Sequence, residues 1–223
     1  MSRKAKKVRD KWRSKKWFSV FSPPYFGEVE LATVPTTDPS GILGKTIETT
    51  LYDVTKDFSH QNIGIVFQVS GVEGNRADTI FKGHEYARDY LRSLIRRGGS
   101  RVDGIFDVVT KEGYKVRLSV IACALRRVNA TQSNALRLTM KRVAEEKALS
   151  LTFDQFVQEA VLGKLASDIY NEAKRVAPLR HVGIRKSKLI AQPSPPQVEA
   201  KAKLESPTEK PEGEKPESMT TMQ

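Results

Sequence analysis

The segment from Arg101 to Arg127 constrains the fold more than any other part of the chain, because it has the alternating pattern of a β-hairpin. Apolar residues occupy every second position on both sides of a polar turn at 111–113. This alternation predicts two antiparallel strands with one face in a core. The opposite face of the second strand becomes apolar from Ile121 onward, so we expect that end of the strand to be covered on both sides.

Short alternating segments before the hairpin predict more of the same sheet. Residues 28–34 are expected to form an edge strand that stops at Pro35. Residues 46–54, 63–69 and 77–81 alternate in the same way and predict a three-stranded antiparallel meander. Apolar residues four apart then predict a helix over 83–97, which Gly98 and Gly99 end.

The hairpin is followed by patterns of helical period. Thr152 and Gln155 have the spacing of a capping box, and Pro178 requires the last helix to end before it. The expected elements are helices over 133–148, 152–161 and 165–176 and a final strand around 182–184. Together these patterns predict an α+β fold with a mostly antiparallel sheet.

Net charge limits the class of partner. The chain of 223 residues has a formal net charge of +12, and 39% of its residues are hydrophobic. This composition suits one folded domain, and the charge favours an anionic partner such as a nucleic acid. No apolar run is long enough to span a membrane or to act as a signal peptide, so we expect an intracellular protein without a membrane partner.

The two ends of the chain differ in charge. Residues 1–22 are expected to form a basic arm, because 1–19 contain nine lysines or arginines against one acid and both tryptophans. Such an arm suits structured RNA, the alternatives being a solubilising tail or a localisation signal. Residues 191–223 are expected to be a disordered tail rich in proline, glutamate and lysine, after a single domain over 23–190. From residue 192 the tail has four lysines and six glutamates, a net charge of 4 − 6 = −2, so the basicity lies elsewhere.

Cationic side chains gather at four places in the sequence: the arm, the end of the 83–97 helix, the segment after the hairpin and the final strand. We expect these groups, with neighbouring polar or aromatic residues, to contact RNA phosphates and bases. The predicted RNA-binding residues are Arg3, Lys4, Lys6, Lys7, Arg9, Lys11, Trp12, Arg13, Lys15, Lys16, Trp17, Arg96, Arg97, Arg101, Arg126, Arg127, Asn129, Arg137, Lys141, Arg142, His181, Arg185, Lys186 and Lys188.

Motifs for catalysis, metal binding or cofactor binding are missing from the sequence. It has no phosphate-binding glycine loop, no paired cysteines and no metal-binding histidine pair. Asp103 and Asp107 are expected to pair with cations across the hairpin, and Cys123 to be a small buried hydrophobe. The three histidines are expected to be structural or to face RNA. We therefore expect no enzyme, metal site, cofactor or small-molecule substrate.

Four separate blocks of the sequence form a specific set: 45–54 (KTIETTLYDV), 81–97 (FKGHEYARDYLRSLIRR), 110–118 (TKEGYKVRL) and 179–186 (LRHVGIRK). In sequence and in order they resemble the archaeal and eukaryotic small-subunit ribosomal protein S3Ae family, also called the eukaryotic-type S1 family, and the archaeal form most of all. The resemblance runs from the arm to about Ile190. It implies a β-barrel-like core flanked by helices, on the platform of the small subunit near the messenger exit, without enzymatic activity.

The resemblance and the charge lead to the same hypothesis, a structural constituent of the small ribosomal subunit that supports translation in the cytoplasm. The implied partners are ribosomal RNA and neighbouring ribosomal proteins, with messenger RNA near the exit as a further candidate. Two alternatives stay open at this point: a free translational regulator that binds messenger RNA, and an RNA-processing enzyme with an unrecognised site.

Overall fold

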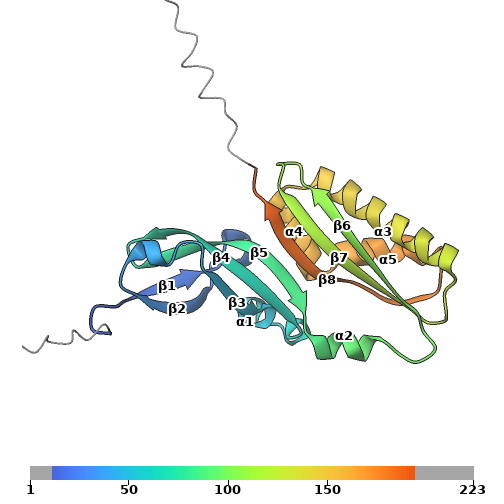
Figure 1. Cartoon of the computed structure of the whole chain (residues 1–223), viewed down its shortest axis with the longest axis horizontal. Coiled ribbons are helices and arrows are strands. Elements are labelled where there is room, and N and C mark those ends of the chain that lie inside the picture. The colour runs from blue at the N-terminus through green and yellow to red at the C-terminus, as the bar shows by residue number, and fades with distance from the viewer. Residues whose placement is uncertain (1–11, 194–223) are drawn as a thin grey trace, which may run out of the picture. The chain divides into compact units, whose positions relative to one another are not determined.

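The computed structural model describes residues 12–193 (Figure 1). The predicted contacts at Arg3, Lys4, Lys6, Lys7, Arg9 and Lys11, and the tail from 194 onward, lie outside this range. The strands are β1 (Lys16–Phe21), β2 (Glu30–Thr36), β3 (Thr46–Thr50), β4 (Ile63–Glu73), β5 (Arg76–Tyr86), β6 (Arg101–Val109), β7 (Lys115–Ala124) and β8 (Leu179–Ala191). The α-helices are α1 (Leu51–Thr55), α2 (Arg88–Leu94), α3 (Ala130–Ser150), α4 (Phe153–Leu162) and α5 (Lys164–Ala173).

All eight strands belong to one mixed sheet. Its main order is β2-β1-β5-β8-β7-β6, and β4 joins β5 while β3 joins β4. The β1–β5 pair is parallel, and the other pairs are antiparallel. Strands β2, β3 and β6 each have a single neighbour, so the sheet branches at β5 and stays open. The α+β class is confirmed, but the prediction of a barrel-like core is wrong.

The branch arises because β5 has different neighbours along its length. Residues 76–78 pair with β1, whereas residues 83–85 pair with β8. At the β8 end the two main chains come so close that a Cβ on Gly83 would lie 2.3 Å from the Ser187 carbonyl oxygen. Only glycine fits at this position without moving one of the strands.

A buried histidine strengthens the same junction. His84 is 2% exposed, and its Nε2 lies 3.1 Å from the Ile184 carbonyl oxygen. A carbonyl can only accept, so Nε2 carries the proton, and Nδ1 accepts a hydrogen bond from the Ser187 hydroxyl at 2.6 Å. Burial lowers the pKa of His84 to about 4, which keeps the ring neutral. Of the two expectations for this histidine, the structural one is confirmed.

Helices α3, α4 and α5 cover one face of the C-terminal strands (Figure 1). The even-numbered residues of β7, among them Val116, Leu118 and Val120, point into this core. Helix α4 contributes Phe153, Phe156, Val157, Ala160 and Val161. The predicted hairpin is therefore confirmed as β6 and β7, and its apolar alternation marks the helix-covered face.

Two predicted elements end differently in the structure. The expected strand over 46–54 stops at Thr50, whose hydroxyl accepts from the Asp53 N–H while the Asp53 carboxylate accepts from the Thr50 N–H. This capping box starts α1, so the second half of the segment is helical. The hydrogen bonds from Thr50 also lower the pKa of Asp53.

The prediction of a helix over 83–97 is wrong for the first part of that segment. Residues 83–86 continue β5, and the helix spans only Arg88–Leu94, with no buried residue. Tyr86 and Tyr90, which are four residues apart, do not lie on one helix. Their rings are in contact, with centroids 5.4 Å apart. The edge strand is confirmed as β2, but it continues through Pro35, as an edge strand permits.

Replacing Gly83 by alanine is expected to lower the unfolding free energy by about 2 kcal/mol or more, because the methyl group meets the main chain of β8. Gly71→Ala is the matched control, since a Cβ at Gly71 has nothing within 4 Å. Urea unfolding of both variants measures the difference. Equal midpoints for the two variants would contradict a tight β5–β8 junction.

Acid should weaken the fold through His84. Its folded pKa of about 4 lies below the ordinary 6.5, so the unfolded chain binds more protons in this window. The unfolding free energy therefore has its full value above pH 6.5. It decreases by about 3 kcal/mol as the pH falls toward 4. The change of urea midpoint with pH should therefore be much smaller in His84→Gln than in the native protein. The pH dependence of His84→Gln is compared with that of His181→Gln, because burial also lowers the pKa of the half-buried His181.

Candidate nucleic-acid interface

The turn between α2 and β6 brings two arginines beside the end of β7. Gly99 lies so close to β7 that a Cβ there would sit 2.5 Å from the Ala124 carbonyl oxygen. The Ala124 N–H donates to the Ser100 carbonyl at 2.8 Å and completes this contact. The turn therefore fixes the main chain immediately after Arg96 and Arg97.

A pocket of about 420 Å³ opens at this point, and we call it the arginine pocket. Its lining contains four arginines, Arg96, Arg97, Arg101 and Arg180, and no acidic residue. Arg101 is ion-paired to Asp103, with its Nε 2.8 Å from Oδ1. Within residues 12–193 the other three guanidinium groups have no ion-pair partner. Positive charge that no carboxylate compensates makes the pocket attractive to anions.

Arg180 was not among the predicted contact residues. Cys123 of β7 faces His181, whereas the next residue, Ala124, faces Leu179, so Arg180 is the extra residue of a β-bulge. A bulge redirects a side chain that simple alternation would place elsewhere. The only signal in the sequence was the position of Arg180 within the block that resembles the S3Ae family.

Cations continue from the pocket toward α3. Arg126 and Arg127 follow β7 after Leu125, are exposed, and have no ion-pair partner among the described residues. Asn129 precedes α3, and its N–H donates to the Gln132 side chain at 3.3 Å. The structure thus gives Asn129 a place at the helix cap, and its contact with RNA stays a prediction.

The predicted cations on α3 are engaged within the protein. Arg137 donates to the main-chain carbonyl of Asp103 at 3.0 Å. Lys141 and Arg142 pair with acidic residues on α3 and α5. These pairs are Lys141–Glu145, Arg142–Glu146 and Arg142–Glu172. The charges of Lys141 and Arg142 are partly compensated, and the donors of Arg137 are engaged by neutral oxygen acceptors. These three residues are therefore weaker candidates for RNA than Arg126 and Arg127.

The predicted cations on β8 also differ in whether they are paired within the protein. Lys186 pairs with Glu85 at 2.7 Å, and the Nε of Arg185 is buried without a hydrogen-bond partner. Lys188 is exposed. Burial, and then the nearby Arg180, lower the pKa of His181. His181 is therefore neutral at pH 7 and adds no charge to the surface.

Both hairpin aspartates are ion-paired, but only Asp107 pairs across the hairpin as expected, whereas the partner of Asp103 lies on its own strand. Asp107 lies 2.6 Å from Arg117, which lowers the pKa of Asp107, and Asp103 pairs with Arg101. Cys123 is buried, and burial raises the pKa of its thiol. Neither observation indicates catalysis.

The described part of the arm presents aromatic rings and cations together. Trp12 and Trp17 are 59% and 58% exposed, and their rings meet edge to face at 6.4 Å. The Lys15 ammonium lies 4.1 Å from the centre of the Trp12 ring. Arg13 and Lys16 are exposed beside them. Exposed indole rings and cations are suited to stacking on bases and pairing with phosphates.

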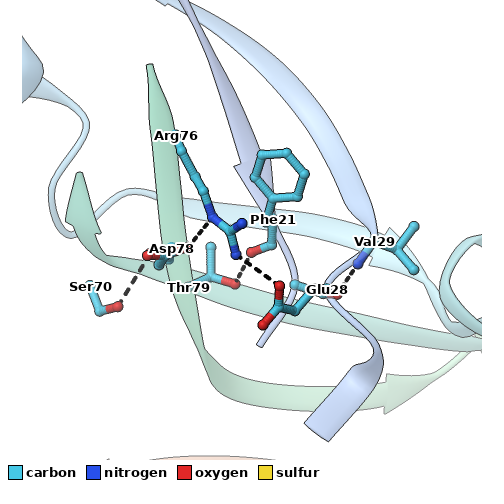
Figure 2. Close-up of polar contacts among 8 residues, drawn as sticks. Phe21, Glu28, Val29, Ser70, Arg76, Asp78 and Thr79 are labelled. Carbon is cyan, nitrogen blue, oxygen red and sulfur yellow. Dashed lines mark hydrogen bonds and ion pairs between the residues drawn. The ribbon is translucent and has the colours of Figure 1, made fainter. Parts of the chain in front are cut away.

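The arm leads into a strand that is held firmly, as Figure 2 shows. The Thr79 hydroxyl donates to the Phe21 carbonyl at 2.7 Å, and the Arg76 guanidinium lies 4.6 Å from the Phe21 ring. Arg76 also donates to Asp78 at 2.9 Å and to Glu28 at 3.1 Å. These contacts link the end of β1 to β5. Trp17 lies near the start of the same strand, and Trp12 precedes it.

Residues 12–193 contain neither a metal-binding cluster nor a membrane-spanning helix. Within residues 12–193 no group of three or more histidine, cysteine, aspartate or glutamate side chains could hold a metal ion. In the same range no helix has the length and apolar character needed to cross a membrane. Unpaired arginines around a pocket, together with exposed indole rings, are typical of a surface that binds nucleic acid.

Comparison with known proteins identifies the family. The Ribosomal S3Ae family matches residues 3–193. A protein from Staphylothermus marinus named small ribosomal subunit protein eS1 is 44% identical over 188 residues, covering 84% of this chain and 89% of that protein. Proteins of the same name from Saccharolobus solfataricus and Archaeoglobus fulgidus are each 45% identical, covering 86% of this chain and 93% and 92% of their own.

The chain therefore belongs to the ribosomal S3Ae family, and the resemblance seen in the sequence is confirmed. The three relatives are archaeal, as the resemblance predicted. The family consists of ribosomal proteins, which confirms that this chain is not an enzyme.

Replacing Arg126 and Arg127 together by glutamine should weaken binding to structured RNA and leave the melting temperature nearly unchanged. Each lost phosphate contact reduces the slope of log Kd against log salt by about 0.7 to 0.9, so the double variant should lose up to about 1.8. Fluorescence anisotropy at several salt concentrations measures this slope.

The matched control is the double replacement of Lys141 and Arg142 by glutamine, which removes paired cations from the same part of the chain. We expect a smaller loss of binding from this control. An equal loss from both double variants would show that pairing within the protein does not decide which cations bind RNA.

Proposed function

We propose that this chain is a structural component of the small ribosomal subunit that binds ribosomal RNA electrostatically and supports translation. The observation that supports the proposal most is the set of arginines without carboxylate partners at the arginine pocket and after β7. Family membership provides the anionic partner that these charges require, since the relatives are named as small-subunit proteins. A protein with this function binds RNA through its charge and shape and does not need a catalytic centre.

The proposed RNA surface has three parts. The arm of residues 1–22 provides cations and stacking rings, the arginine pocket with Arg126 and Arg127 provides uncompensated charge, and Lys188 with Arg185 extends the surface along β8. The paired cations of α3 have a secondary role in this arrangement. The body of residues 23–190 is the proposed folded domain, and the last part of the arm adds β1 (Lys16–Phe21) to its sheet. The tail of 191–223 has the wrong net charge for RNA.

The proposed location is the platform of the subunit near the messenger exit, a proposal that the resemblance to the family supports. Neighbouring ribosomal proteins are proposed partners there, and messenger RNA is a further candidate. The exposed Leu138 and Leu149 on α3 are 69% and 67% accessible in the isolated chain, which leaves apolar area for protein neighbours.

Sedimentation of cell extract through a sucrose gradient at low magnesium tests the proposal. Low magnesium separates the subunits, and the chain should then comigrate with the small subunit at one copy per particle. A tagged Arg126→Gln, Arg127→Gln variant should enter the subunit less efficiently than the tagged native chain. A chain that stays at the top of the gradient, or one present in far less than one copy, would contradict the proposal.

A further inference from the structure

The lining of the arginine pocket includes apolar side chains that phosphate binding alone does not require. Ile95 and Leu125 line the pocket and are 40% and 59% exposed, although each lies next to an arginine in the sequence. Phosphate oxygens need only cations and N–H donors. Two accessible aliphatic side chains among four guanidinium groups therefore indicate a ligand with an apolar face as well as negative charge.

The size of the pocket limits that ligand. Its volume of about 420 Å³ is at the lower end of the roughly 300–1,000 Å³ typical of small-molecule sites. A nucleic-acid duplex is far too wide to enter such a space. One nucleotide, with its base inside and its sugar–phosphate chain at the mouth, is compatible with it.

The state of the RNA follows from the chemistry of the bases. In an A-form duplex the faces of the bases are stacked on one another, and only their edges and the backbone are accessible. An unpaired nucleotide in a bulge, loop or end can present the face of its base to aliphatic groups and to guanidinium planes. The aliphatic side chains of Ile95 and Leu125 therefore favour an unpaired nucleotide over a paired one.

Charge outside the pocket supports a chain of phosphates rather than a single anion. Arg126 and Arg127 follow Leu125 directly, so uncompensated positive charge extends beyond one side of the pocket. Arg96 and Arg97 stand on its lining at the α2 turn. The nearby carboxylate of Asp103 is occupied by Arg101 and does not line the pocket.

We propose that the arginine pocket binds one unpaired RNA nucleotide, whose base packs against Leu125 and Ile95 while its flanking phosphates pair with Arg96, Arg97 and Arg180. This inference rests on the proposed function and deepens it, because it specifies which kind of RNA element this surface selects. An acidic peptide with apolar side chains has related chemistry. The extension of cations on Arg126 and Arg127 favours the regularly charged RNA chain.

The test compares three probes on the full-length protein by fluorescence anisotropy. They are an eight-nucleotide single-stranded RNA, the same strand without bases at its central positions, and an eight-base-pair RNA duplex. Leu125→Ser should weaken binding of the intact single strand on the order of fivefold, as expected for one lost base contact, and should leave binding of the other two probes unchanged. Ile95→Ser is an independent second variant with the same expected pattern.

Leu43→Ser is the matched control, because Leu43 is an exposed leucine outside the pocket, and it should change none of the three affinities. Melting curves of each variant confirm that it is folded. The inference is overturned if Leu125→Ser and Ile95→Ser leave single-strand binding intact, or weaken the duplex and the baseless strand as much. Leu125-dependent binding of a glutamate–leucine peptide, without an effect on the single strand, would also overturn it in favour of a protein ligand.

The same measurements separate this inference from the proposed function. If the native chain comigrates with the small subunit and binds RNA in a salt-dependent way, but the pocket variants behave like the native chain, only the pocket assignment fails. If the native chain binds none of the RNA probes and sediments alone, the proposed function fails with it.

Discussion

The fold depends on a three-residue pairing between β5 and β8. Within residues 12–193 it is the only strand pairing that joins the first five strands to the last three. Gly83 permits the close approach of the two main chains, and both ring nitrogens of His84 form hydrogen bonds to residues of β8. A protonated His84 could no longer accept from Ser187, so the junction needs a neutral imidazole, which burial provides.

The same sheet decides which cations remain available to a partner. Arg101 and Arg117 lie on strands opposite or beside aspartates and are compensated there. Arg126 and Arg127 leave the end of β7 where no acidic residue follows them, and the bulge directs Arg180 to the same end. Net charge alone therefore does not show which cations remain available to a partner, because some of them, such as Arg101 and Arg117, are paired within the protein.

Much of this fold could be predicted, because the hairpin and the apolar faces of α3, α4 and α5 follow regular periods of two or 3.6 residues. The errors arose where a side-chain interaction overrides the period, as in the capping box at Thr50, or where backbone pairing does, as at Gly83. Closure of a sheet is decided by pairings far apart in the sequence, so the branch at β5 left no local pattern. For the site, charge clusters were visible in the sequence, but ion pairing and the bulge at Arg180 were not.

The bulges between β7 and β8 have a consequence for how this chain can vary. The register shifts three times along the pair, so β8 uses 13 residues against 10 in β7. Exposed positions such as Lys188 can change identity without disturbing the strands. Loss or gain of one residue between Leu179 and Ser187 would turn every later side chain to the opposite face. Strand β8 is thus permissive toward substitution and intolerant of any change in length.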